Sequence, residues 1–136
     1  MRSEVEILQD AFGLDKKAAV AKFLDLGEDA NAFWTLYDAY EVERKKLGIR
    51  RIEVLQEYAK DFANLSDDKI TELYKSASAV RQSYDKLLDK YFKLFKKEFG
   101  ASKAAQFWQL ESYINVMIQV SIYTNIPFIG ENISNN

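Results

Sequence analysis

An apolar series spaced alternately by three and four residues constrains the fold of this chain more than any other feature. The spacing places all its members on one face of a long helix, which then requires a partner helix at a shallow crossing angle. The sequence therefore predicts a helical hairpin whose second arm carries the series. Its members are Ile70, Leu73, Ala77, Val80, Tyr84, Leu87, Tyr91 and Leu94.

The residues before this series supply the partner helix. A helix is predicted from Glu28 to about Phe62, because its strongest interruption is Gly48, which costs only about 1 kcal/mol relative to alanine. After a short turn, Ser66 is a typical N-cap for the second arm. We therefore expect the two arms to form a long antiparallel hairpin over residues 28–99.

Shorter elements flank the hairpin. Residues 3–12 show helical spacing of apolar side chains, and Asp15 can cap a second short helix. After the hairpin, Gly100 ends the second arm and Ser102 can cap a C-terminal helix over residues 101–125, followed by a tail at 126–136. The apolar face predicted for the second short helix comprises Ala19, Val20, Phe23 and Leu24.

The end of the second arm carries a second apolar stripe, which predicts additional neighbours there. The stripe comprises Leu88, Phe92, Phe95 and Phe99. The C-terminal helix is apolar on most of its circumference, so we expect it to be buried among other helices. The predicted fold is therefore a single all-α domain over residues 1–136, with the C-terminal helix packed at the open end of the hairpin.

The composition excludes several chemistries. The chain has no cysteine and no histidine, so it lacks thiol nucleophiles, imidazole bases and the usual zinc ligands. The acidic clusters around Glu28 and Asp67 are typical of helix starts and do not follow the spacing of a calcium-binding loop. We therefore expect no enzymatic activity and no cofactor.

Charge and hydropathy also limit the partners. A net charge of −2 argues against obligatory binding of nucleic acid, which normally requires a strongly basic surface. No apolar run reaches the roughly 20 residues that a membrane-spanning helix needs. We therefore expect neither nucleic acid nor a membrane-spanning segment, and a protein is the expected partner.

Two basic clusters are the candidate contact surfaces, one in each arm of the predicted hairpin. Each contains five basic and three acidic residues, so a solvated face with salt bridges is the ordinary interpretation, and docking of an acidic partner is the alternative. The aromatic residues near them are interpreted first as core and second as a groove for apolar segments. The candidate partner-binding residues are Arg44, Lys45, Lys46, Arg50, Arg51, Phe92, Lys93 and Lys97.

Two similar segments stand at the starts of the predicted arms, LGEDA at residues 26–30 and LSDDK at residues 65–69. They resemble relaxed versions of the LTxxQ element of Spy/CpxP-like periplasmic proteins, in which each element also begins a long helix. Ser66 matches the threonine position, whereas Gly27 does not, and neither segment has the final glutamine. Residues 90–118 resemble uncharacterised bacterial secreted helical proteins more closely.

The resemblance implies a periplasmic or secreted protein that is dimeric through its long helices. Such a protein binds unfolding clients on an apolar, basic-rimmed concave face without ATP. The expected function is therefore that of a non-enzymatic helical binding protein of the bacterial envelope, acting as an ATP-independent chaperone or stress-response protein. The alternative is a scaffold or accessory subunit that docks one dedicated partner through the hairpin.

Overall fold

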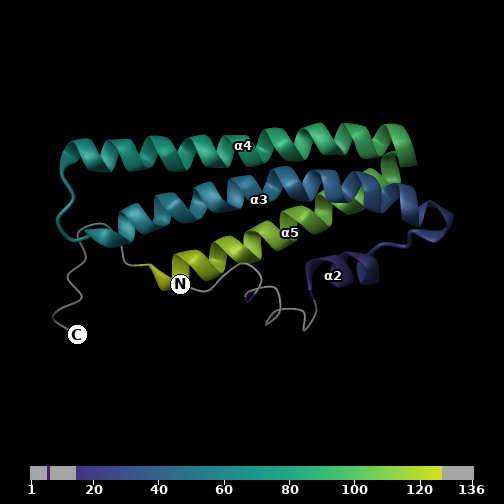
Figure 1. The fold of residues 1–136 in the computed structure, drawn as a ribbon, viewed down its shortest axis with the longest axis horizontal. Coiled ribbons are helices and arrows are strands. Elements are labelled where there is room, and N and C mark those ends of the chain that lie inside the picture. The colour runs from purple at the N-terminus through teal and green to yellow at the C-terminus, as the bar shows by residue number, and fades with distance from the viewer. Residues whose placement is uncertain (1–5, 7–14, 127–136) are drawn as a thin grey trace. The chain divides into compact units, whose positions relative to one another are not determined.

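The computed structural model describes residue 6 and residues 15–126, and the described part of the chain is helical apart from short connections (Figure 1). The predicted all-α class is confirmed. The predicted short helix at residues 3–12, apart from residue 6, and the tail beyond Ile126 lie outside the described residues. The elements are α2 (Lys16–Phe23), the 3-10 helix η1 (Gly27–Asp29), α3 (Ala30–Lys60), α4 (Asp67–Phe99) and α5 (Ala101–Asn125). Among them, no helix is both long and apolar enough to cross a membrane.

Local side-chain chemistry sets two of the helix starts as predicted. The carboxylate of Asp15 accepts a hydrogen bond from the backbone N–H of Ala18 at 2.8 Å, which caps α2. The hydroxyl of Ser66 accepts one from the backbone N–H of Lys69 at 3.1 Å, which caps α4. Both predicted N-caps are therefore confirmed.

The connection between α4 and α5 is a single residue, Gly100. Its φ of +92° is a conformation that residues with a Cβ rarely adopt, and this turn ends α4. The carbonyl of Gly100 accepts a hydrogen bond from the backbone N–H of Ala104 at 3.2 Å, so α5 begins at once. The prediction that Ser102 caps α5 was wrong, because Ser102 lies inside the first turn of the helix.

The chain divides into two compact units, and α3 and α4 each contribute to both. The first unit comprises Met1–Asp38 and Leu88–Asn125, and the second comprises Ala39–Leu87 and Ile126–Asn136. Each unit has a core of its own.

The first unit is centred on packed aromatic rings from α3, α4 and α5. The ring centroids of Phe95 and Phe107 lie 4.3 Å apart, and those of Phe33 and Phe95 lie 5.1 Å apart. Phe33 also stacks on Tyr37 at 5.7 Å. These four rings are at most 1% exposed, so the interpretation of the aromatic cluster as core holds for them.

The second unit pairs the later part of α3 with the earlier part of α4. A salt bridge of 3.0 Å joins Glu57 to Lys69 near the connection between the helices. Farther from it, the guanidinium of Arg51 lies 4.3 Å from the centre of the Tyr84 ring. These contacts are consistent with the predicted antiparallel hairpin, and Figure 1 shows the two segments side by side. Leu73, Val80 and Leu87 of the predicted series are buried, whereas Ala77 is exposed.

Two expectations about burial were wrong. Phe23, predicted to lie on the apolar face of α2, is the last residue of the helix and is 54% exposed, whereas Ala19, Val20 and Leu24 of that predicted face are buried. Helix α5 is not buried around its whole circumference. Its buried face comprises Ala104, Phe107, Glu111, Ile114, Ile118 and Ile122, and its large exposed side chains are Trp108, Tyr113, Val116, Val120 and Tyr123.

Candidate protein-binding surface

A buried carboxylate connects three helices of the first unit. Glu111 lies on the buried face of α5 and is 4% exposed. Its Oε2 accepts a hydrogen bond from Lys16 Nζ of α2 at 2.9 Å, and its Oε1 accepts one from the Tyr37 hydroxyl of α3 at 2.6 Å. The ammonium of Lys16 also lies 5.5 Å from the centre of the Tyr37 ring. The cluster therefore holds α2, α3 and α5 together.

This cluster was not predicted, although the sequence contains a signal for it. Glu111 is the only charged residue between Ala104 and Ile126, in a segment otherwise made of apolar and neutral polar residues. Such an isolated charge on an apolar helix needs a partner when it is buried. Both oxygens of Glu111 are engaged by donors, so the arrangement is suited to a structural role. Within residue 6 and residues 15–126, no group of three or more acidic side chains is placed to hold a metal ion.

Five basic residues of α3 were predicted to contact a partner, and two of them point towards the interior of the second unit. Arg44 is buried and makes a two-pronged contact with Glu41, with Nε to Oε1 at 2.8 Å and Nη2 to Oε2 at 3.3 Å. Arg51 is half-buried against the face of Tyr84. Both side chains therefore take part in the packing of the hairpin.

The other three basic residues of α3 are exposed to solvent. Lys45, Lys46 and Arg50 share the exposed side of the helix with two aliphatic residues, Val42 and Ile49. Val42 is 59% exposed and Ile49 is 61% exposed, and a separation of seven residues places one above the other along the helix. We call these five residues the outer face of α3.

The outer face of α3 combines two kinds of recognition. Its aliphatic residues can contact apolar side chains of another chain, and its cations can pair with acidic residues of that chain. The sequence analysis did not include Val42 and Ile49 among the candidate contact residues, although they are two of the three apolar residues in the charged segment 41–51, the third being Leu47. At 100° per residue, only Leu47 of the three lies on the inner side with Arg44 and Arg51.

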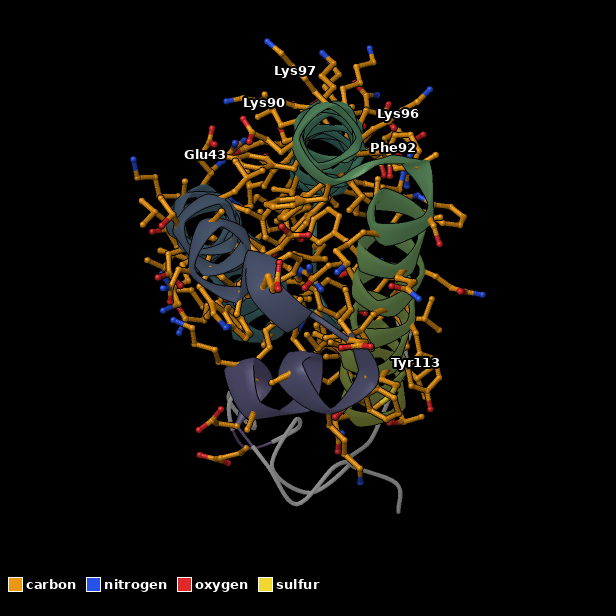
Figure 2. All side chains as sticks on the ribbon, turned by 90° about the vertical axis from the view of Figure 1, so that its right-hand side faces the viewer. Glu43, Lys90, Phe92, Lys96, Lys97 and Tyr113 are labelled. Carbon is orange, nitrogen blue, oxygen red and sulfur yellow. The ribbon has the colours of Figure 1, made fainter. Side chains whose placement is uncertain are left out.

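The remaining predicted contact residues belong to α4 in the first unit. Lys93 and Lys97 are exposed. In Figure 2, Lys97 points away from the helix, and Lys90 and Lys96 also point outward. Phe92 is half-buried and lies on the side of α4 that faces α5 (Figure 2). The role of both basic clusters in binding a partner stays a prediction.

One ion pair in the second unit changes the titration of its members. The hydrogen bond from Lys69, followed by the positive charges of Lys69 and Lys60, lowers the pKa of Glu57 below its ordinary value. The same hydrogen bond to Glu57 raises the pKa of Lys69. Both groups are accessible to water, so the pair contributes to the surface electrostatics near the hairpin turn and only weakly to stability.

Comparison of the chain with models of protein families, with curated proteins and with solved structures gave no match.

Proposed function

We propose that this chain is a non-enzymatic helical protein that binds segments of other polypeptide chains through the outer face of α3. The observation that carries the proposal is the exposure of Val42 and Ile49, two turns apart, beside three cations on the same side of the helix. Exposed apolar side chains that lie together on one side of a helix can form a contact surface for another chain.

The chemistry of this surface suits partners that combine apolar and acidic side chains. Burying the exposed parts of Val42 and Ile49 contributes about 2 kcal/mol to the free energy of binding. The cations add an electrostatic attraction to acidic residues, which salt weakens. Binding of this strength is weak for one segment and suits transient capture of many different unfolding chains. We therefore propose an ATP-independent chaperone-like activity, located in the bacterial envelope as the resemblance at residues 26–30 and 65–69 implies.

A dedicated partner is the second candidate function, and the spacing of the aliphatic pair favours it. Two apolar residues seven positions apart form the start of a helical seam, which a partner helix can cover at a shallow angle. In this case the protein is a scaffold or accessory subunit that recognises one helix of one partner.

The test measures how far the protein suppresses aggregation of a chemically unfolded model protein, without nucleotide and over a range of molar ratios. We expect suppression near stoichiometric amounts. Ile49→Asp should require about tenfold more protein, because the charge opposes burial of the surface. The matched control is Tyr74→Asp, which changes an exposed apolar residue on α4 of the same unit.

The outcomes separate the two functions. No suppression by the native chain at large excess contradicts the chaperone-like activity and leaves the dedicated partner. Equal losses from Ile49→Asp and Tyr74→Asp contradict the assignment to the outer face of α3. A charge reversal at Lys45 and Lys46 should remove most of the salt dependence of suppression, because those cations are exposed.

A further inference from the structure

Helix α5 carries a second group of exposed apolar side chains, in addition to those on the outer face of α3. Four large side chains on it are more than half exposed: Tyr113 (57%), Val116 (53%), Val120 (55%) and Tyr123 (70%). Their spacing of three, four and three residues aligns them along one side of the helix, opposite Ile114 and its buried neighbours. We call these four residues the α5 stripe, and Figure 2 shows its first member, Tyr113, on the outer side of α5.

The α5 stripe lacks the charges that a solvated helix face normally carries. The only charged residue between Ala104 and Ile126 is Glu111, and that residue is buried on the opposite side of α5. An exposed helix that is apolar on its solvent side generally meets another surface. A spacing of three and four residues suits another helix that crosses at a shallow angle.

The order of the residues in the α5 stripe indicates which helix can pack against it. Tyrosine, valine, valine and tyrosine follow at intervals of three, four and three, so the pattern is the same in both chain directions. An antiparallel copy of α5 therefore places Tyr113 opposite Tyr123 of the second copy and Val116 opposite Val120 of the second copy. This is the self-complementarity that a two-fold interface requires. We infer that the chain forms a homodimer through the antiparallel pairing of two α5 stripes.

The charge and the exposed area of the α5 stripe are compatible with a second copy of the chain as its partner. The stripe has no charge that an identical stripe would repel, whereas a membrane-surface helix would carry lysine or arginine beside its apolar face, and α5 has none beyond Lys103. The exposed parts of the four side chains amount to roughly 400 Å² on each protomer, or about 800 Å² in total, which is below the roughly 1,200 Å² of stable specific complexes and fits a weak, reversible dimer.

The test is sedimentation equilibrium of the full chain from low micromolar concentrations to about 1 mM. We expect a concentration-dependent dimer. Val116→Glu and Val120→Lys should each raise the dissociation constant at least tenfold, because each places a charge against a valine of the second copy. The matched control is Val42→Glu, which changes an equally exposed valine in α3 and should leave the dimer intact.

Mixing the two charged variants tests the antiparallel arrangement. In an antiparallel pair, the new glutamate faces the new lysine while the remaining valines face each other, so an equimolar mixture should dimerise again. In a parallel pair, each new charge faces a valine, and mixing restores no such ion pair. Circular dichroism should show unchanged helix content, since both positions are exposed.

Three results would overturn the inference. The first is a native chain that stays monomeric throughout the concentration range, and if it then sediments with phosphatidylcholine vesicles, the stripe contacts lipid instead. The second is a dimer that Val116→Glu does not weaken, which places the interface elsewhere. The third is a mixture of variants that stays monomeric. Because Val42→Glu affects only the outer face of α3, failure of the dimer is distinguishable from failure of the proposed function.

Discussion

The hydroxyl of Tyr37 donates a hydrogen bond of 2.6 Å to Oε1 of Glu111, although the two residues are 74 positions apart in the chain. The other carboxylate oxygen accepts from the ammonium of Lys16. The contact is buried, so each of the three polar groups depends on the others to compensate for its removal from water. The stability of the first unit therefore rests partly on one polar cluster within an apolar core.

Replacement of this carboxylate should be costly. Glu111→Ala leaves Lys16 and Tyr37 without that acceptor and should lower the free energy of unfolding by about 3 kcal/mol, measured by urea denaturation. The control is Glu28→Ala, an exposed acid of the same unit, which should change the value by less than about 0.5 kcal/mol. Equal effects of the two substitutions would show that the cluster does not stabilise the fold.

The aromatic core of the first unit should be sensitive to truncation. Phe95 is fully buried between Phe33 and Phe107, so Phe95→Ala should lower the free energy of unfolding by about 3 to 5 kcal/mol, measured by urea denaturation.

Phe92→Asp should also lower the thermal unfolding temperature, because it places a charge on the half-buried side of α4 facing α5. The exposed Phe23 is the control, and Phe23→Ala should have little effect. Unchanged unfolding of the Phe92 variant would contradict the packing of α5 against this residue.

The turn at Gly100 should tolerate a larger residue poorly for a purely conformational reason. A Cβ at this position would meet no atom within 4 Å, so Gly100→Ala introduces no clash. The positive φ alone should cost about 1 to 2 kcal/mol of unfolding free energy in urea titrations. Gly27→Ala, at a φ of +51°, should show a cost of the same sign. If both alanine variants were as stable as the native chain, the turns would not require glycine.

The ion pair between Glu57 and Lys69 should show opposite pH dependences for its two members. The pKa of Glu57 is lowered from 4.5, so its stabilising contribution is present above that pH and is lost as the pH falls through the folded pKa. The pKa of Lys69 is raised from 10.5, so its contribution is present below that pH and is lost as the pH rises through the folded pKa. NMR titration of the Glu57 carboxyl should show its pKa returning towards 4.5 in Lys69→Ala. An unchanged pKa in that variant would contradict the assignment to Lys69.

The sequence was sufficient for the features that depend on neighbouring residues. The caps at Asp15 and Ser66 follow from side chains that reach the first turn of their own helices. The all-α class follows from apolar spacing, which is also a local property. The prediction that Ser102 caps α5 was wrong for a local reason. Gly100 ends α4, and its carbonyl accepts the first hydrogen bond of α5, so no capping side chain is needed.

The features that the sequence did not predict depend on residues distant in the chain. Nothing near Glu111 indicates that Lys16 and Tyr37 reach it. Apolar composition alone also did not distinguish the buried and exposed sides of α5, since aliphatic and aromatic residues occur on both, with isoleucine on the buried side and valine on the exposed side. Composition located the basic cluster of α3, but the direction of each side chain decides which of its residues solvent reaches, and binding through this surface stays a prediction.

The single-residue connection at Gly100 has a consequence for folding kinetics. It lets Phe95 and Phe107 meet after closure of a very short loop, whereas the contact between Lys16 and Glu111 spans 95 residues. Short loops close at lower entropic cost, so the α4–α5 corner should be largely formed in the transition state and the Lys16 contact should form after it. In stopped-flow experiments, Phe107→Leu should therefore mainly slow folding, whereas Lys16→Met should mainly accelerate unfolding.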